Sequence, residues 1–452
     1  MMDATPVGAL YDSLLQSALR QFFERATLDT EPTASGATDG RLAIEPSANP
    51  SALIIRWFGT RYTLRVPARW PFTSHEVRLA QAIGAVLAAR YRAIQNPRIL
   101  AERADLFSGL IEDRYVGAFL DPRSYAVDAR ETRADRIASI IEMLRVAALS
   151  SYENRPISTG VLLLGTSDDP VRPGTHVTSA VLSYTEELTR IKSFYRMAEG
   201  VHTLFLASSE GRLLDIIDIR RWAGAARQSS LTARPFPPHA RATLQHGHVC
   251  AVLSPSREIK IFAEGTEMFT FRGAEWHLAD VQAKFRLWAD AVGDDPLAAR
   301  IFQTARDLSE AREGALFVVV REPEVAVPQI VAPADRLDLP MREPLARGDG
   351  SEEPTRRHLL HLLERRTITD LDPSVFMGLA ALDGATVTDR SGRILAAGAI
   401  LRHPPSQQLD AGIEVEGART TAAMAASQFG PVLKVSEDGI ITFFDRERVW
   451  DI

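Results

Sequence analysis

The spacing of apolar residues predicts helices and short strands in the first part of the chain. Leucine and phenylalanine recur every three or four positions over residues 7–25, which predicts an amphipathic helix. Two runs rich in β-branched and aromatic residues, 52–58 and 61–66, flank Gly59 and predict a β-hairpin. Residues 30–50 show neither period and are rich in Thr, Gly, Ser and Pro, so we expect a mobile loop there.

Helical patterns recur along the rest of the chain. A long helix is expected after Ser74, because Glu76 lies near its start and arginines lie near its end, as the helix dipole prefers. Residues 320–356 are rich in Pro and acidic residues and are longer than an ordinary loop, so we expect a surface excursion. The other segments expected to be helical or packed are residues 281–292, 297–313, 355–367 and 373–382. Together with the strands, they indicate a mixed α/β (α+β) fold.

The length of 452 residues is too great for one ordinary core, so two or three domains are expected. We assign residues 1–130 to a small α+β domain, 136–290 to a middle α/β domain and 298–452 to a C-terminal domain. A linker is expected near residues 122–133. The net charge of −6 argues against a nucleic-acid-binding surface, which would be basic.

Cysteine use and hydropathy indicate a cytoplasmic protein. Cys250 is the only cysteine, so neither an intramolecular disulfide nor a cysteine-based zinc site can form. The first residues lack the pattern of a signal peptide, and no apolar run approaches 18 residues, so we expect no membrane segment. Arginine greatly outnumbers lysine, which we attribute to the base composition of the genome. The four lysines are Lys192, Lys260, Lys284 and Lys434.

Two segments near the C-terminus combine groups suited to a nucleoside triphosphate. The turn at Asp383 and Gly384 offers a carboxylate that can hold a divalent metal ion or activate a hydroxyl. Gly417 and Arg419 stand at the expected start of a helix, where unpaired N–H groups and the positive end of the dipole attract phosphate oxygens. The planar guanidinium of Arg419 can also grip a phosphate.

Each of these features also has a purely structural explanation. Asp383 with Gly384 can simply form a tight turn. Arg419 can make a surface salt bridge, and Thr420 and Thr421 can act as N-caps of the helix. The residues alone leave these alternatives open.

The same motifs give the last third of the chain a family resemblance. Residues 298–452 resemble the diadenylate cyclase (DAC) domain of the DisA N-terminal type, with five motifs in the family's order. The matching segments are residues 314–320 (its first core strand), Asp383-Gly384-Ala385 (its Asp-Gly-Ala motif), 392–398 (the following strand), 417–419 (its Gly-Thr-Arg-His-Arg motif) and 435–439 (its last hairpin).

The resemblance implies a central mixed sheet flanked by helices and the condensation of two ATP molecules into cyclic di-AMP with Mn²⁺ or Mg²⁺. It implies that Asp383 is the catalytic and metal-binding carboxylate and that Glu437 is a second metal ligand, although Glu437 could equally be a solvated hairpin charge. Because each domain would hold one ATP, it also implies a homodimer or higher homo-oligomer. The nucleotide-binding residues implied are Gly384, Ala385, Gly417, Arg419, Thr420, Thr421 and Ser436.

One position departs from the family pattern. The family's Arg-His-Arg is replaced by Arg419-Thr420-Thr421. Threonine hydroxyls can donate to phosphate, but an uncharged donor is roughly half as strong as a charge-assisted one. Two functions therefore stay open: a diadenylate cyclase regulated by its N-terminal region, or a catalytically inactive domain that binds a nucleotide as a sensor or scaffold.

Landmarks of the C-terminal domain recur in the middle range in the same order. The apolar run after Gly160 parallels the run after Gly314, and residues 204–214 parallel 385–395. We interpret the middle range as a degenerate copy of the same fold, the alternative being two unrelated domains that share generic pieces. The middle range has His202 at the position of the acidic turn, so it would be structural or sensory rather than catalytic.

Other motifs do not support a function. His246 and His248 have no acidic or cysteine partner at ligand spacing, and His358 and His361 lie among arginines, so neither pair indicates a metal site. The sequence contains no Gly-x-x-x-x-Gly-Lys-Ser/Thr phosphate loop and no Gly-x-Ser-x-Gly nucleophile motif.

Overall fold

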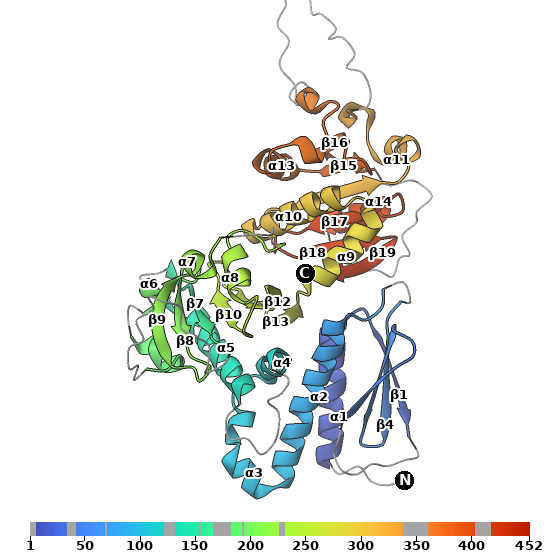
Figure 1. Cartoon of the computed structure of the whole chain (residues 1–452). Helices are drawn as coiled ribbons and strands as arrows, with labels where there is room; N and C mark the ends of the chain where they lie inside the picture. Colours follow the sequence, from blue (N-terminus) through green and yellow to red (C-terminus); the bar gives the residue numbers. More distant parts are fainter. Residues whose placement is uncertain are drawn as a thin grey trace, which may run out of the picture. The chain divides into compact units, whose positions relative to one another are not determined.

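The computed structural model describes residues 6–33, 42–67, 70–121, 132–152, 155–165, 182–191, 194–225, 231–337, 360–402 and 417–452. The fold is mixed α+β, as predicted, with β-sheets flanked by helices (Figure 1). The chain forms two compact units. The first consists of Met1–Ser230 and Pro235–Asp280, and the second of Leu231–Arg234 and Val281–Ile452. The three ranges expected from the sequence divide the first unit further, near residues 130–136.

The first unit begins with a four-stranded antiparallel sheet in the order β1-β4-β3-β2. Helices α1 and α2 lie side by side along this sheet (Figure 1), and their apolar faces join its buried side chains in one hydrophobic cluster. Thr73 caps α2 in a capping box with Glu76, which explains where the helix starts. The elements are α1 (Pro6–Phe22), β1 (Thr27–Pro32), β2 (Ala43–Pro46), β3 (Ala52–Trp57), β4 (Thr60–Arg65), α2 (Ser74–Gln95), α3 (Pro97–Glu102), η1 (Ala104–Phe107) and α4 (Ile111–Leu120).

The loop predicted for residues 30–50 is wrong in part. Strand β1 extends to Pro32 and pairs with β4, and β2 within the same range pairs with β3. The hydrogen-bond partners of both strands lie in the predicted hairpin, so these strands form through pairing rather than through a hydrophobic pattern of their own. Strand β1 is mostly exposed, which explains why its sequence lacks the alternation of a half-buried strand.

The rest of the first unit is built on a seven-stranded sheet in the order β13-β12-β11-β10-β7-β8-β9. Alternate residues of β7 join two clusters: Val161 and Leu163 pack in the cluster with α5, and Leu162 packs on the opposite face with α7 and α8. The elements are α5 (Arg133–Leu149), β5 (Ser151–Tyr152), β6 (Arg155–Pro156), β7 (Thr159–Leu163), η2 (Glu186–Arg190), α6 (Phe194–Met197), β8 (Thr203–Ala207), β9 (Leu213–Asp218), α7 (Ile219–Ala223), α8 (Pro237–Ala242), β10 (Val249–Leu253), β11 (Ile259–Ala263), β12 (Thr266–Arg272) and β13 (Glu275–Leu278).

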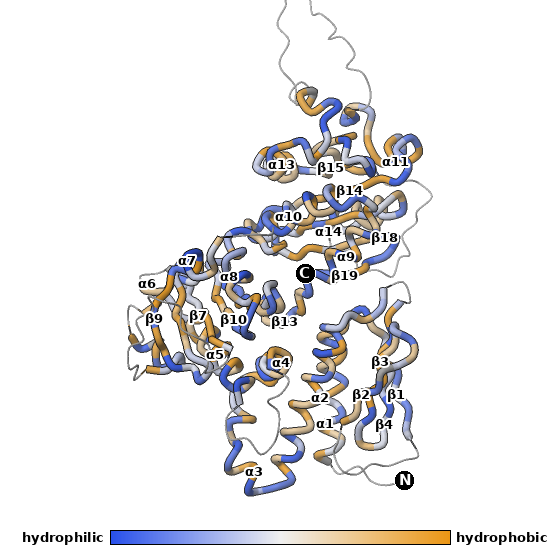
Figure 2. Tube along the Cα trace, viewed as in Figure 1, coloured by the Kyte–Doolittle hydropathy of each residue, from blue (hydrophilic) through white to orange (hydrophobic). Residues whose placement is uncertain are grey.

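The second unit is built on a six-stranded mixed sheet in the order β16-β15-β14-β17-β18-β19. Helices α11 and α14 pack on one face, and α10 and α13 contact the strands from the other, where Phe317 meets Phe376. Figure 2 shows mainly apolar residues along strands of this sheet, and both polar and apolar residues along α10. The elements are α9 (Val281–Val292), α10 (Asp295–Ala311), β14 (Ala315–Val320), α11 (Pro323–Ile330), η3 (Pro333–Asp335), η4 (His361–Leu363), η5 (Ile368–Asp370), α13 (Pro373–Ala380), β15 (Ala385–Asp389), β16 (Ile394–Ala399), α14 (Gly417–Ala426), β17 (Val432–Val435), β18 (Ile441–Asp445) and β19 (Glu447–Asp451).

The seven-stranded and six-stranded sheets share one strand order. Read from β9 and from β16 respectively, the first six positions of each sheet hold corresponding strands. In each sheet the pair β7–β8 or β14–β15 is parallel, and the other pairs between described strands are antiparallel. The turns correspond too: the backbone N–H of Tyr184 donates to Gly211 O at 2.9 Å, and that of Ile368 donates to Gly392 O at 2.8 Å. The two sheets therefore have the same topology.

One landmark of the repeat was predicted in the wrong register. Leu253 and Val435 correspond in both sequence and structure, and they pair with Thr159 and Ala315 respectively. Gly160 therefore lies inside β7, whereas its predicted counterpart precedes β14, a displacement of two residues. The error arises because strand pairing, rather than the glycine before an apolar run, sets the register.

Several predicted connections fall partly outside the described residues. Residues 122–131 of the linker predicted near 122–133 lie outside the described residues. The predicted surface excursion is described as far as residue 337 and contains α11 and η3. Residues 355–359 of the helix predicted at 355–367 lie outside the described residues; Leu360 is helical, and the 3₁₀ turn η4 follows it. No helix among the described residues combines the length and the apolar character needed to cross a membrane.

Candidate functional site

The residues singled out in the sequence lie together at one end of the strands of the six-stranded sheet, where β14 and β15 begin and β17 ends; we call this end the edge of the sheet. Strands β14 and β15 are parallel, so their N-terminal ends lie at the same edge, with Leu316 paired to Ala385. Strand β17 runs antiparallel to β14, which brings its C-terminal end to that edge, with Ala315 paired to Val435. The acidic turn before β15 and the hairpin after β17 therefore become neighbours, although 50 residues separate Ala385 from Val435 in the numbering.

Helix α14 brings Arg419 to this edge. Ala423 and Ala426 bury one face of the helix against the sheet, which fixes the direction of its first turn. The guanidinium passes close to the backbone at Gly314, where an added Cβ would lie 2.2 Å from Arg419 Nη1. A side chain at position 314 would therefore occupy the place of this guanidinium.

The Arg419 guanidinium lies between the two predicted carboxylates. Its Nη1 donates a hydrogen bond to Glu437 Oε1 at 2.8 Å, and its Nη2 is 3.7 Å from Asp383 Oδ1. The side chains of Asp383 and Glu437 are 94% and 74% exposed, and that of Arg419 is 36% exposed. The cluster is thus open to a dissolved ligand, and its charges can rearrange when a ligand binds.

Gly384 holds the acidic turn in place. Its φ of +110° is a conformation that residues with side chains rarely adopt, and an added Cβ would lie 2.5 Å from the carbonyl carbon of Gly398. The backbone of the turn therefore packs directly on β16. This close packing, together with the buried Ala385 that begins β15, determines where the Asp383 side chain emerges.

Lys434 lies beside this cluster and was not predicted from the sequence as a site residue. Its Nζ donates a hydrogen bond to Thr420 Oγ1 at 3.0 Å, from β17 to the first turn of α14. The signal in the sequence was a lysine within the otherwise apolar strand 432–435, a pattern that breaks the alternation of a buried strand.

The other predicted nucleotide-binding residues have local roles in the structure. The Thr421 hydroxyl donates to Gly417 O at 3.4 Å, one turn earlier in α14. The Ser436 hydroxyl is used in its own hairpin turn, where it accepts a hydrogen bond from the Ile440 N–H at 3.2 Å. Ser254 makes the same bond in the corresponding hairpin of the first unit, so turn formation alone accounts for a serine there. Gly417 has a φ of +78°, and an added Cβ there would meet no atom of the described residues within 4 Å, so these residues let a ligand approach its backbone.

The site offers two carboxylates to a divalent metal ion. No group of three or more His, Cys, Asp or Glu side chains is placed to hold a metal within the described part of the chain. Asp383 and Glu437 are oxygen donors of the kind that Mg²⁺ and Mn²⁺ prefer, and Mg²⁺ in nucleotide sites commonly takes one or two carboxylates together with substrate phosphates. The residues therefore fit a metal that arrives with a phosphate ligand.

The corresponding edge of the seven-stranded sheet carries different groups. His202 precedes β8 in the position that Asp383 has before β15. Glu199 lies nearby, but its carboxylate accepts hydrogen bonds from backbone N–H groups of its own turn. His239 on α8 is fully buried, donates through Nε2 to Gly200 O at 2.8 Å, and has a pKa lowered to about 4 by burial. A buried neutral imidazole and a turn-capping carboxylate do not form an open charged site.

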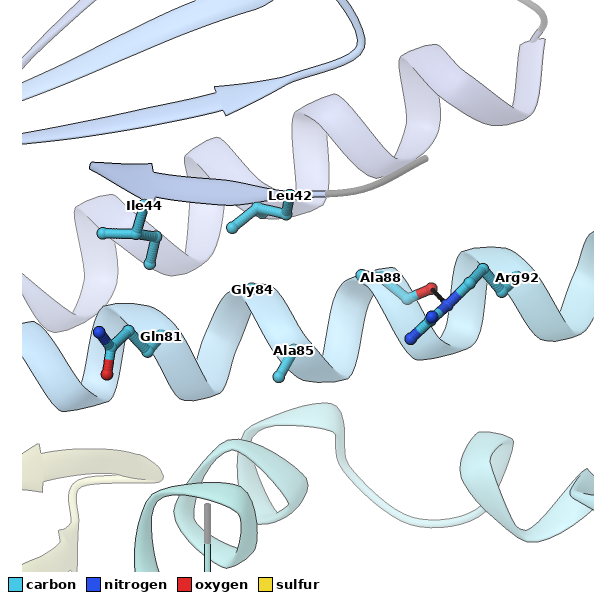
Figure 3. A pocket seen from close by; sticks show the side chains of 7 residues that line it. All are labelled: Leu42, Ile44, Gln81, Gly84, Ala85, Ala88 and Arg92. Carbon is cyan, nitrogen blue, oxygen red and sulfur yellow. Dashed lines mark hydrogen bonds between the residues drawn. The ribbon is translucent and has the colours of Figure 1, made fainter. Parts of the chain in front are cut away.

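A pocket of about 460 Å³ lies elsewhere in the first unit, between α2 and the segment leading into β2 (Figure 3). In Figure 3, Gln81 and Arg92 lie at opposite ends of the lined stretch of α2, and the Arg92 Nε donates to Ala88 O at 3.3 Å. Among the described residues that line it there is no carboxylate, thiol or imidazole. Its residues are Leu42, Ile44, Gln81, Gly84, Ala85, Ala88 and Arg92.

Comparison with known proteins gives limited similarity. No protein-family model matches the sequence, and no curated protein matches it. Among solved structures, the crystal structure of a double mutant of DacA from Staphylococcus aureus is 18% identical, with a TM-score of 0.21, over 34% of this chain and 83% of that chain. The crystal structure of a hypothetical membrane-spanning protein from Bacillus cereus is 19% identical, with a TM-score of 0.23, over 38% of this chain and 75% of that chain. Similarity at this level assigns no activity to the present chain.

Proposed function

We propose that the second unit binds ATP at the edge formed by β14, β15, β17 and α14, and that it condenses two ATP molecules into cyclic di-AMP. The observation that carries the proposal is the position of Arg419, which contacts both Asp383 and Glu437. These three residues come from three separate motifs of the DAC resemblance. Their meeting at one exposed cluster is what a phosphate and metal site of that kind requires.

The reaction joins the 3′-hydroxyl oxygen of one ATP to the α-phosphorus of another. The bond between the α-phosphorus and the bridging oxygen breaks, pyrophosphate leaves, and the hydroxyl proton passes to a base. The Asp383 carboxylate is exposed and has the charge to accept that proton or to orient the hydroxyl. Repeating the step in the opposite direction closes the ring, so two ATP yield one cyclic di-AMP and two pyrophosphates.

Arg419 supplies the charge for the phosphates. Without ligand, its guanidinium is neutralised by Asp383 and Glu437; with ATP bound, it turns toward the anionic phosphate oxygens, which it can contact in a bidentate manner. Asp383 and Glu437 are then available to a divalent metal ion. Such an ion, when bound, would screen the phosphate charge and lower the pKa of the attacking hydroxyl.

Closing both phosphodiester bonds needs two ATP molecules that face each other. The cluster described here has one arginine and two carboxylates, which is a site for one nucleotide. A second copy of the chain would bring the second ATP, so the proposal includes a homodimer or larger homo-oligomer.

A second candidate is a nucleotide-binding sensor or scaffold without catalysis. The observation in its favour is that Thr420 and Thr421 carry no charge where the family has His and Arg, and that the Thr421 hydroxyl is bonded within its own helix. Binding without turnover would then be the function of the site.

The test is incubation of the full-length protein with ATP and Mn²⁺, with cyclic di-AMP and pyrophosphate measured by mass spectrometry and enzymatic assay. We expect two pyrophosphates per cyclic product. Arg419→Ala should lower the rate about a hundredfold, since removing one preorganised charge donor has an effect of this size. Arg393→Ala is the matched control, because the exposed Arg393 also pairs with an aspartate, Asp389 at 3.2 Å, but at the other end of β15.

Each outcome separates the candidates. Product formation that Arg419→Ala slows about a hundredfold and Arg393→Ala leaves intact supports the cyclase. Saturable ATP binding without product, again lost in Arg419→Ala, leaves the sensor. Absence of any ATP binding by the wild-type protein would overturn both.

A further inference from the structure

Lys434 occupies a position in β17 where alternation places apolar side chains. Val432, two residues earlier on the same face, packs in the hydrophobic cluster under α14. Leu316, which pairs with Lys434 from the neighbouring strand, belongs to that cluster too. In the corresponding register of the seven-stranded sheet the residue is Val252, which is fully buried among apolar side chains. A lysine thus replaces the aliphatic residue that the fold accepts at this position.

The lysine reaches the first turn of α14 from beneath. The residue is 9% exposed, and its ammonium donates to Thr420 Oγ1 at 3.0 Å. Because an ammonium has donors and no acceptor, the threonine oxygen accepts this bond and the hydroxyl proton is available to a further acceptor. Thr420 is adjacent to Arg419 in the first turn of the helix, where the N–H groups and the dipole favour an anion.

We infer that Lys434 supplies the second positive charge for the triphosphate, acting through the Thr420 hydroxyl. This inference rests on the proposed function and specifies its ligand as a polyphosphate, whose several negative charges are bound by more than one cation. The charge that is missing from α14 at the Arg-His-Arg position is then supplied from β17 by Lys434. The Lys434 ammonium polarises the Thr420 hydroxyl, which in turn donates to the phosphate. Hydrogen bonds in such a chain strengthen one another because the ammonium polarises the hydroxyl.

Lys434 is therefore a positioning residue for phosphate rather than a group that touches the reacting atoms. A charge that acts on phosphate has an effect that depends on the number of phosphates in the ligand, whereas a structural role does not. The affinities of the full-length protein for ATP and for adenosine, measured by isothermal titration calorimetry, distinguish the two.

The central variant is Lys434→Met, which keeps the length and the apolar stem but removes the charge. We expect it to weaken ATP binding about tenfold and to leave adenosine binding unchanged, since a hydrogen bond to a charged group contributes at about this level. Lys434→Arg should restore most of the ATP affinity. The matched control is Lys284→Met in the same unit, because the Lys284 ammonium donates to Asp451 O at the β19 edge of the sheet; this variant should bind ATP as the wild type does.

A double-mutant cycle tests the route through threonine. Thr420→Val removes the hydroxyl while keeping the shape, and it should weaken ATP binding by itself. If lysine acts only through that hydroxyl, removing its charge has no further effect once the hydroxyl is gone. The double variant Lys434→Met/Thr420→Val should then bind ATP about as weakly as Thr420→Val, rather than showing the product of the two losses.

The inference fails separately from the proposed function. If Arg419→Ala abolishes ATP binding while Lys434→Met binds ATP as tightly as the wild type, the site stands and the role of Lys434 is overturned. Equal weakening of ATP and adenosine by Lys434→Met would show a structural effect and would also overturn it. A double variant whose loss of ATP affinity equals the product of the two single losses would show that Lys434 does not act through the Thr420 hydroxyl. If the wild type binds neither ligand, the proposed function falls and the inference with it.

Discussion

At the scale of single residues, two glycines decide what the candidate site contains. Gly314 leaves room for the Arg419 guanidinium, and Gly384 lets the acidic turn pack on the backbone of β16. The two glycines differ in what an added methyl group would meet: the end of a flexible side chain at Gly314, and backbone atoms at Gly384. This difference separates an effect on binding from an effect on stability.

Gly314→Ala should impair the site more than the fold. The added Cβ would lie 2.2 Å from Arg419 Nη1, so the guanidinium must move, while the chain itself can accommodate the alanine. We expect the free energy of unfolding to change by less than about 1 kcal/mol and ATP affinity to fall about tenfold. Calorimetric binding and urea unfolding measure the two quantities. Gly378→Ala is the control, since a Cβ there meets no atom of the described part of the chain within 4 Å. Unchanged ATP affinity in Gly314→Ala would contradict the position of Arg419.

Gly384→Ala should destabilise the second unit. The substitution combines a φ of +110° with contacts of 2.5–2.8 Å to backbone atoms of Gly398 and Ala399, which cannot move without breaking the β15–β16 pairing. We expect a loss of about 2–3 kcal/mol in the free energy of unfolding, measured by urea denaturation. Gly392→Ala is the control at a similar φ of +80°, where the Cβ meets the tip of Leu297 at 3.2 Å; a loss as large in this control would show that φ alone, and not the close packing, determines the cost.

At the scale of elements, ion pairs connect the first turn of α2 to Glu264 and Asp280 of the same unit. His75, in the first turn of α2, bonds through Nδ1 to Asp280 Oδ1 at 2.7 Å and lies 3.5 Å from Glu264. These partners, Asp280 first, raise the pKa of His75 from 6.5 to about 9. The same contact with His75 lowers the pKa of Glu264 from 4.5 to about 2. The helix is thus held by a histidine that is charged at neutral pH.

The stabilisation by His75 should disappear at high pH. Because the pKa is raised in the folded state, the contribution is fully present below pH 6.5 and is lost as the pH rises through about 9. His75→Gln should therefore be less stable than the wild type at pH 6 and should approach it at pH 10, as measured by urea unfolding at both values. A difference for His75→Gln that is equal at both pH values would exclude the charged pair as its cause.

At the scale of the whole molecule, the two sheets share one topology but have different side chains at the corresponding ends of their strands. The edge before β14 and β15 presents Asp383, Arg419 and Glu437 to solvent, whereas the corresponding edge before β7 and β8 contains the buried His239. One chain would then hold one ATP and need a second chain for the reaction. The shared topology also shows that this fold tolerates either kind of edge, since the strand pairing is the same in both.

The proposed reaction should depend on protein concentration. Because each chain would bring one ATP, the rate of cyclic di-AMP formation per chain should fall when the protein is diluted below the dissociation constant of the dimer. Initial rates over a dilution series at saturating ATP, together with light scattering, measure both quantities. A rate per chain that stays constant while the protein is monomeric would contradict the dimeric mechanism.

Local signals in the sequence determined where most elements lie. The helix at 281–292 was predicted at the bounds of α9, and the hairpin around Gly59 is β3–β4, because apolar periods and turn residues act over a few neighbouring positions. The short edge strands β1 and β2 were missed, since their stability comes from partners elsewhere in the chain. The acidic turn and the arginine were likewise visible as motifs, because each consists of adjacent residues.

The tertiary structure alone decided which of these motifs meet. The parallel pairing of β14 with β15 and the antiparallel pairing of β17 bring Asp383, Arg419 and Glu437 together from positions up to 54 residues apart. The same pairing sets Lys434 beneath Thr420, a contact that no local pattern encodes. Sequence spacing specifies which groups a chain possesses, but the register between strands distant in sequence determines which of them share a site.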